Sequence, residues 1–308
     1  MIFVSDEELE RLKREIHTRL REGVSEELRG WNWDRPPVAP YSRSILFGVS
    51  ALAGRYCENF RDIYLRYVLK RKVPVSEKLV RGLFFHRLIY RTISAARSVV
   101  LSSWPFKIEE LEKALNSVRD LVGKSAEDVA LRLGREPSPE DMVRAEALRK
   151  FMVRQIVCEV ERVRMRHPWP NVETVLAEAL PSVAERRIDG SRLGLSRSLS
   201  VDLLEGNLIL EVKTGDVRPF HKYAIAGYAL ALEAATGVPH DAGIIIYVGF
   251  LENGDPVLRH RSVLVDDALR REFLAIRDEA AEIVENGIDP GMPTHCPDYC
   301  PWRQVCHG

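Results

Sequence analysis

Three charged residues in one short segment have the types and spacing of a metal-dependent phosphodiesterase site. Residues 199–213 read Leu-Ser-Val-Asp-Leu-Leu-Glu-Gly-Asn-Leu-Ile-Leu-Glu-Val-Lys and contain Asp202, Glu211 and Lys213. Two neighbouring carboxylates can share a hard cation such as Mg²⁺ or Mn²⁺, and a nearby lysine can orient water or offset charge on a phosphate. The alternative is a solvent-facing hairpin on which these residues meet by chance.

The alternation of this segment predicts two strands joined by a tight turn. Gly206-Asn207 is a two-residue hairpin signal, and the arms on both sides alternate between apolar and polar residues. If the flanking residues close the turn, Asp202 lies directly opposite Glu211, with the Cβ atoms about 5 Å apart. This register places every apolar side chain on one face of the hairpin. It places Asp202, Glu211 and Lys213 on the other.

Length and composition indicate a soluble globular chain. The 308 residues, 45% of them hydrophobic, are enough for one large domain or two smaller ones. The first residues lack the pattern of a signal peptide and no run approaches a membrane span, so we expect a cytoplasmic protein. Seven Asn and two Gln, against 45 Lys and Arg plus 45 Asp and Glu, are typical of a heat-adapted protein.

The formal net charge is zero, but basic residues concentrate in one region. Residues 55–107 hold twelve Lys or Arg against three acids. Such a segment can line a channel for a phosphate backbone. A solvated helical face is the alternative interpretation.

Three of the five cysteines, Cys296, Cys300 and Cys306, lie within eleven residues near the end of the chain. In a reducing cytoplasm, closely spaced thiols indicate a metal site or a metal cluster, although hyperthermophiles also form disulfides there. His295 and His307 flank the three cysteines and could act as zinc ligands. The spacing therefore leaves zinc open beside an iron–sulfur cluster.

Three cysteines leave one ligand position to fill. Cys57 is the favoured fourth ligand, because Cys158 lies in an apolar helical context and is interpreted as an ordinary core residue. A metal site that joins Cys57 to the tail closes a loop of roughly 240 residues and would act as a staple for the fold.

The elements that must position these residues form a helical first half and an α/β second half. Helical patterns cover residues 5–30, 50–103 and 107–166, with breakers at 31–40 and 137–139. Strands are then expected over 183–213, 242–250 and 257–264, and helices over 219–233, ending near Gly237, and 267–286. A hairpin followed by a helix and a buried strand predicts an α/β core with a mixed sheet.

Together these parts resemble the RecB-like nucleases that carry a four-cysteine iron–sulfur cluster. Within them the chain resembles the fourth CRISPR-associated (Cas) family, in its archaeal variant from subtype I-A systems. The shared features are an early Cys, Gly-x-x-x-His, Asp, Glu-x-Lys, a helix with the Tyr of Gln-x-x-x-Tyr, and three Cys at the end. The resemblance covers residues 54–90, 190–250 and 292–308.

The resemblance implies a restriction-endonuclease-like (PD-(D/E)xK, RecB-type) mixed-sheet core, a large helical N-terminal lobe and an iron–sulfur-bound C-terminal lobe. We accordingly divide the chain into four parts. They are an N-terminal helix and connector (1–40), a helical lobe with the first cluster cysteine and the active-site histidine (41–180), a nuclease core (181–290) and a cluster-binding tail (291–308).

The resemblance also implies roles for single residues. The implied ligands of a [4Fe–4S] cluster are Cys57, Cys296, Cys300 and Cys306. The implied ligands of a divalent metal are His86 of Gly82-Leu-Phe-Phe-His86, Asp202, Glu211 and the carbonyl of Val212. Lys213 would serve the attacking water, and Tyr228 would lie near the DNA backbone. Without the resemblance, a lone His between Phe85 and Leu88 is more often a satisfied core residue than a ligand, and Tyr228 could be an ordinary core residue.

Two positions depart from the family pattern. The position of the glutamine in Gln-x-x-x-Tyr is Ala224, which removes a polar side chain one helical turn before Tyr228. Three residues separate Cys296 from Cys300, where the family more often has two. The first departure affects activity or DNA handling, and the second leaves the cluster type open.

The resemblance implies a metal-dependent DNA exonuclease that trims single-stranded or partly duplex ends for CRISPR spacer acquisition. Its implied partners are DNA and the CRISPR integrase proteins, with no membrane partner and with a homo-oligomer left open. One alternative is a non-catalytic module of the same architecture that binds DNA and proteins. Another is a zinc-stapled transcription or scaffold protein with a chance hairpin.

Overall fold

A five-stranded mixed sheet forms the centre of the computed structural model, which describes residues 3–20, 23–118, 120–167, 169–181 and 183–307. The strands follow the chain order β1 Val183–Ile188, β2 Leu199–Glu205, β3 Leu208–Lys213, β4 Ala242–Phe250 and β5 Pro256–Leu264. β3 and β4 are parallel, and the other neighbouring pairs are antiparallel. The predicted α/β class with a mixed sheet is therefore confirmed.

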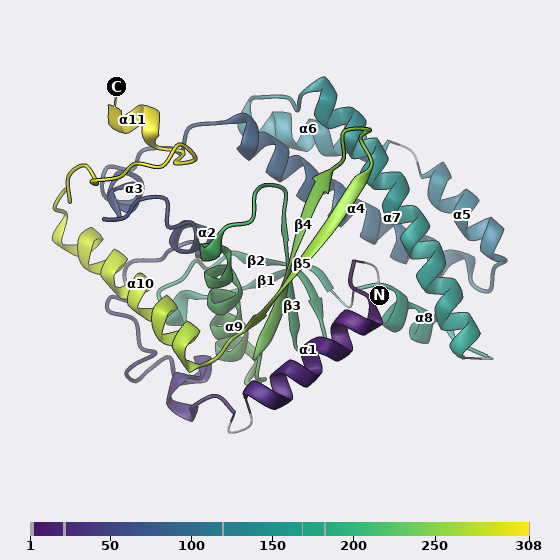
Figure 1. Cartoon of the computed structure of the whole chain (residues 1–308), viewed down its shortest axis with the longest axis horizontal. Helices are drawn as coiled ribbons and strands as arrows, with labels where there is room; N and C mark the ends of the chain where they lie inside the picture. Colours follow the sequence, from purple (N-terminus) through teal and green to yellow (C-terminus); the bar gives the residue numbers. More distant parts are fainter. Residues whose placement is uncertain (1–2, 21–22, 119, 168, 182, 308) are drawn as a thin grey trace.

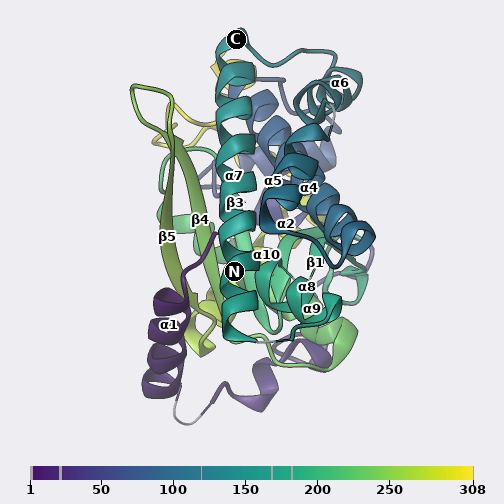
Figure 2. The same ribbon diagram turned by 90° about the vertical axis from the view of Figure 1, so that its right-hand side faces the viewer.

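The helices of the first half cover one face of this sheet (Figures 1 and 2). They are α4 Glu77–Ser103, α5 Ile108–Ser117, α6 Leu121–Leu133, α7 Pro139–Arg166 and α8 Val172–Ala179. Leu203, Leu210 and Val212 of the sheet pack into the same hydrophobic core as these helices. Within the described ranges, no helix is long and apolar enough to cross a membrane.

A second core covers the opposite face. It contains α2 Val49–Ala53, α9 Lys222–Thr236 and α10 Asp267–Asn286, together with Val201 and Ile209 of the hairpin. The prediction that all apolar residues of the hairpin share one face is therefore wrong. Because helices pack on both faces of the sheet, its central strands are apolar on both sides.

The helical boundaries differ from the predicted ones in the first half. The helix expected over 5–30 is α1 Asp6–Arg19, which starts with a capping box of Ser5 and Glu8 and is followed by two short 3₁₀ turns. The pattern over 50–103 is divided into α2, α3 Arg61–Ile63 with a π-helical turn Tyr64–Val68, and α4. Pro74 lies in the extended stretch before α4, where its ring disfavours a helix. Helix α8 was not predicted.

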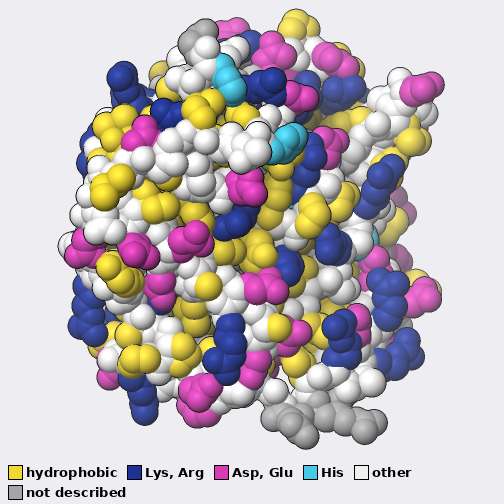
Figure 3. Space-filling view, turned by 60° about the vertical axis from the view of Figure 1, so that its left-hand side comes forward, with side chains coloured by type: hydrophobic (Ala, Val, Ile, Leu, Met, Phe, Trp, Pro, Cys, Tyr) yellow, Lys and Arg dark blue, Asp and Glu magenta, His cyan; other side chains and the backbone are white. Residues whose placement is uncertain are grey.

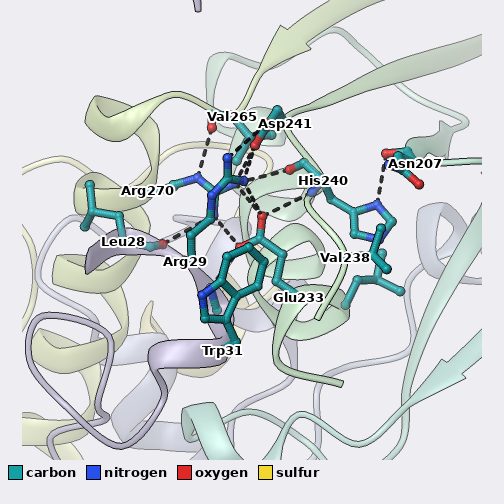
Figure 4. Close-up of polar contacts among 12 residues, drawn as sticks. Leu28, Arg29, Trp31, Asn207, Glu233, Val238, His240, Asp241, Val265 and Arg270 are labelled. Atoms are coloured by element: carbon teal, nitrogen blue, oxygen red, sulfur yellow. Dashed lines mark hydrogen bonds and ion pairs between the residues drawn. The ribbon is translucent and has the colours of Figure 1, made fainter. Parts of the chain in front are cut away.

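A buried ion-pair network fixes α9 to the elements around it (Figure 4). The Glu233 carboxylate on α9 accepts hydrogen bonds from Arg270 of α10 at 2.7 and 2.8 Å and from Arg29 at 2.9 Å. It also accepts the backbone N–H groups of Gly30 (2.8 Å) and His240 (3.1 Å). Glu233 and Arg270 are both fully buried. One carboxylate thus joins α9, α10, the N-terminal segment and the residues that lead into β4.

Replacing Glu233 with glutamine should destabilise the protein strongly near neutral pH. The substitution leaves the buried Arg270 guanidinium without its counter-charge, and breaking a buried pair in this way costs about 3–5 kcal/mol. Burial opposes ionisation of Glu233, but Arg270 and the two N–H groups outweigh it and hold its pKa below the ordinary 4.5. The stability difference between wild type and Glu233→Gln is therefore full above a pH of 4.5. It is lost as the pH falls through the lowered pKa of Glu233.

Guanidinium unfolding of both proteins between pH 3 and pH 7 measures this difference. Glu27→Gln is the matched control, because Glu27 pairs with Arg271 at 2.8 Å on the surface and should change stability by less than about 1 kcal/mol. Equal stability of Glu233→Gln and Glu27→Gln at neutral pH would contradict the role assigned to the network.

Candidate active site and cysteine site

The hairpin β2–β3 has the predicted turn, but its pairing ends one residue short of the predicted carboxylate pair. The ladder runs from Glu205↔Leu208 to Leu203↔Leu210, and Gly206 has the positive φ (55°) that a glycine tolerates in such a turn. The predicted ladder pair of Asp202 with Glu211 is wrong. At the next position of β2, the Asp202 carboxylate accepts the Val212 N–H at 2.8 Å. A side-chain oxygen thus takes the place of a backbone carbonyl as the partner of that N–H.

Helix α4 brings His86 to Asp202. The His86 Nδ1 lies 3.2 Å from Asp202 Oδ1, and both side chains are partly exposed. Burial lowers the pKa of His86, but the Asp202 charge outweighs this effect and raises it. Conversely, burial raises the pKa of Asp202, but His86, Lys213 and the Val212 N–H hold it below its ordinary value. His86 therefore interacts with a carboxylate of the candidate site and is not a histidine held only within the core.

Glu211 is the most deeply buried carboxylate of this group, at 4% exposure. Its Oε1 accepts a hydrogen bond from Lys213 Nζ at 2.5 Å, whereas its Oε2 is buried without a partner. Burial and then the charge of Asp202 raise the pKa of Glu211 to about 7. Glu211 thus keeps one carboxylate oxygen buried without a partner, although Lys213 binds the other.

Helix α9 adds Tyr228 to the site from the other core. Tyr228 is 8% exposed, and burial together with the charges of Glu211 and Asp202 raises its pKa well above 10. Ala224, one turn earlier, is buried among apolar residues of the same core. Ala224 therefore provides no polar side chain in place of the glutamine of the family pattern.

The three tail cysteines gather in a small apolar cluster. Cys300 is buried with Trp302 and Leu65, and Cys296 and Cys306 pack against them. Burial and then Cys296, Asp62 and Cys57 act to raise the pKa of Cys300, which reaches about 11. The electrostatic effect of Cys57 on Cys300 places the predicted fourth cysteine in the same region.

Contacts outside the thiols hold the two segments together. Asn59 Nδ2 donates to the carbonyls of Pro290 (3.2 Å) and Gly291 (2.9 Å), and Arg61 pairs with Asp289 at 3.2 Å. The cysteines of the described residues are all free of disulfides. The structure thus brings the Cys57 segment and the C-terminal tail side by side, as the staple interpretation requires.

The remaining candidates of the sequence analysis are Cys158 and the alternative zinc ligands His295 and His307. Cys158 is exposed and is not a core residue. Its buried neighbours Ile156 and Val160 lie two positions away on either side, which is the opposite side of helix α7. His295 and His307, the alternative zinc ligands, are both exposed.

Ion pairs within the molecule neutralise part of the basic segment, mainly on α4. Arg81, Arg87 and Arg91 of α4 pair with Asp141, Glu185 and Asp128, and Arg97 donates to the Pro181 carbonyl. On the face that Figure 3 shows, basic and acidic side chains are interspersed. The exposed residues 70–72, Lys-Arg-Lys, precede α4, so the basic segment is neither a continuous channel lining nor merely a solvated helical face.

Comparison with known proteins identifies the family. A sequence model described as CRISPR-associated exonuclease Csa1 matches residues 1–308. The chain belongs to this family. A protein of that name from Saccharolobus solfataricus is 32% identical over 291 residues, which cover 94% of each chain. Another from Thermoproteus tenax is 31% identical over 284 residues, covering 92% of this chain and 91% of the relative. The family resemblance inferred from the sequence motifs is therefore confirmed.

Among the residues expected to hold a divalent metal, one carboxylate oxygen is left without a partner, and a cation would fit there. Within the described residues, no three His, Cys, Asp or Glu side chains already form a metal-binding group. Lys213 occupies one oxygen of Glu211 and His86 faces one oxygen of Asp202. The unpartnered Oε2 of Glu211 is the atom that a cation would satisfy, since hard cations prefer carboxylate oxygens.

Sequence reasoning missed the aromatic residues beside Lys213. Tyr247 is its register partner on β4 and lies within 3.0 Å of His221 Nδ1 through its hydroxyl. Burial, followed by the charge of Lys213, lowers the pKa of His221 to about 4. Burial raises the pKa of Tyr56, and the Lys213 charge opposes that shift. The available signal was the position of Tyr56 directly before Cys57.

The difference in burial predicts the order of thiol modification. In reduced, chelator-treated protein under native conditions, Cys158 should react first with iodoacetamide, and Cys57 and Cys300 last. Burial limits access to both slow thiols, and a pKa of about 11 leaves Cys300 with little reactive thiolate at neutral pH. Peptide mass spectrometry over time measures the order, and guanidinium-unfolded protein is the control. Modification of Cys57 before Cys158 would contradict the structure.

Proposed function

We propose that the chain is a divalent-metal-dependent deoxyribonuclease whose site is formed by His86, Asp202, Glu211 and Lys213. The observation that carries this proposal is the buried, unpartnered Oε2 of Glu211 beside a second carboxylate. Leaving a buried carboxylate oxygen unsatisfied is unfavourable, so a cation at this position would stabilise the site. The names of the relatives, CRISPR-associated exonuclease, support a nuclease role in a CRISPR system.

The proposed metal ligands are His86, Asp202, Glu211 and the carbonyl of Val212. Val212 supports this set because its N–H binds the Asp202 carboxylate, and the N–H and C=O groups of one residue in a strand point to the same side. The chemistry that bound Mg²⁺ or Mn²⁺ supplies is activation of water and stabilisation of charge on the phosphate. The Lys213 ammonium, held at Glu211, orients the attacking water and offsets negative charge. Tyr228 lies near both carboxylates and contacts the DNA backbone.

The proposed substrate is a DNA end, single-stranded or partly duplex, and the proposed process is spacer acquisition. CRISPR integrase proteins are the proposed partners. A catalytically weak module that binds DNA and protein is the second candidate, because Ala224 presents no polar group one turn before Tyr228. The complete set of His86, Asp202, Glu211 and Lys213 favours the nuclease.

We also propose that Cys57, Cys296, Cys300 and Cys306 hold a [4Fe–4S] cluster within a C-terminal lobe that packs on a RecB-like nuclease core. Four free thiols in one region are a donor set that such clusters use. The cluster would link the Cys57 segment to the tail. Its contribution would be to the stability of this lobe.

Removing one proposed metal ligand should abolish cleavage. Asp202→Asn should lower the rate of Mn²⁺-dependent trimming of labelled DNA by about a hundredfold or more, because the neutral amide is a poor ligand for a hard cation. Asp34→Asn is the matched control, since Asp34 is an exposed acid in the 31–40 connector and its ion pair with Arg35 is a long surface contact at 3.9 Å. The control should retain wild-type activity.

Binding of Mn²⁺ provides a second readout of the same variants. Mn²⁺ should raise the melting temperature of wild type and of Asp34→Asn but not that of Asp202→Asn. Cleavage that persists in Asp202→Asn would refute the assignment of the site. Absence of cleavage by wild type, with Mn²⁺ stabilisation intact, would favour the binding module.

The cluster has a spectroscopic signature. Anaerobically purified wild type and Cys158→Ser should be brown, with about four irons and four sulfides per chain, and Cys300→Ser should lose both colour and iron. A colourless wild-type protein that contains zinc would contradict the [4Fe–4S] assignment. Loss of iron from Cys158→Ser would contradict the choice of Cys57 as the fourth ligand.

A further inference from the structure

A connected row of aromatic rings runs from the C-terminal tail to the strand beside Lys213. We call it the aromatic bridge and define it as Tyr56, Phe220, His221, Tyr247 and Tyr299. Phe220 is at its centre, with ring centroids 6.0 Å from Tyr299, 6.4 Å from Tyr56 and 5.1 Å from His221. His221 continues the row to Tyr247 at 5.6 Å.

The two ends of the aromatic bridge lie at the two candidate sites. Tyr247 pairs with Lys213 in the parallel ladder, and the Lys213 charge acts on Tyr56, His221 and Tyr247. At the other end, Tyr299 lies between Cys296 and Cys300 in the sequence, and Tyr56 packs against the cysteine cluster. The bridge therefore spans the space between the carboxylate site and the cysteine site.

Three rings of the bridge are more exposed than rings in the core, whereas Tyr247 is buried at 4% exposure. Phe84 and Phe85 of α4 are fully buried, whereas Phe220, His221 and Tyr299 are each partly exposed. The Arg218 guanidinium lies 4.2 Å from the centroid of Tyr299. Partly exposed rings next to an arginine are the combination that binds single nucleic-acid strands, because bases stack on the rings and the cation attracts the backbone.

We propose that the partly exposed rings of the aromatic bridge, Phe220, His221 and Tyr299, form a base-stacking surface that positions a DNA strand at the carboxylate site. Phe220 and Tyr299 are the positioning residues. The proposal rests on the proposed nuclease function and adds the part of the substrate that is recognised, which is the faces of the bases rather than their sequence. Because the cysteine tail supplies Tyr299, loss of the tail structure should weaken strand binding before it affects the chemistry at Asp202 and Glu211.

The test compares strands with and without bases. Labelled single-stranded oligonucleotides carry either normal nucleotides or abasic residues near the end that is trimmed. The dissociation constant is measured with Ca²⁺ and the cleavage kinetics with Mn²⁺, both on the full chain. Wild type should bind the normal strand about tenfold or more tightly than the abasic strand. The same preference should appear in KM.

Phe220→Ala and Tyr299→Ala should reduce this preference to near one, with kcat on the normal strand within about threefold of wild type. Phe220→Leu keeps an apolar side chain and should lose the preference as well, which separates ring stacking from simple packing. Tyr299→Phe retains the ring and should resemble wild type. Tyr41→Ala, at an exposed tyrosine (56%), is the control for loss of a surface ring.

Retention of the wild-type preference by Phe220→Ala and Phe220→Leu would overturn the proposal. So would a wild-type protein that cleaves both strands equally well. Base-dependent binding that the Phe220 variants lose, without cleavage by wild type, would support the stacking surface and refute the nuclease function instead. The two proposals therefore fail in different ways.

Discussion

The constraint around which this structure is organised is the buried carboxylate of Glu211 beside the partly exposed carboxylate of Asp202 at the middle of the sheet. Moving a carboxylate out of water costs several kcal/mol unless charge and hydrogen bonds compensate. Asp202 receives His86 from the helical lobe and the Val212 N–H from the next strand, and Lys213 faces Glu211. One oxygen of Glu211 remains without a partner. The compensation for this oxygen is thus incomplete, and this is the position at which we propose a divalent cation.

The rest of the fold holds these groups in place from two sides. The α4–α8 lobe carries His86, and the opposite core carries Tyr228 on α9, which Glu233 and Arg270 fix by a fully buried ion pair. The cysteine segments are held together by contacts such as Asn59 with Gly291, and the ring of Phe220 contacts Tyr299 of the tail. The proposed strand path and the proposed cluster are therefore parts of one connected structure.

Local patterns predicted what depends on local physics. The Gly206 turn, the breaker before Pro139 and the strand Ala242–Phe250 were predicted because turn chemistry and alternation act over a few residues. The end of the ladder before Asp202 was not, since there the Asp202 side chain binds the Val212 N–H, a contact that strand alternation does not encode. The burial of Cys158 was misjudged because apolar neighbours at i−2 and i+2 lie across the helix. The aromatic contacts near Lys213 join segments far apart in the sequence, so no local pattern contained them.

The central claim is that Asp202 and Glu211 share a divalent cation. An anomalous-difference map from crystals soaked in Mn²⁺ tests it most directly, because it locates the ion without reference to activity. We expect a peak between the two carboxylates, within ligand distance of the Glu211 Oε2 that is now unpartnered. A Mn²⁺ peak elsewhere in the molecule, with Glu211 Oε2 still unpartnered and the Lys213 contact unchanged, would contradict the account.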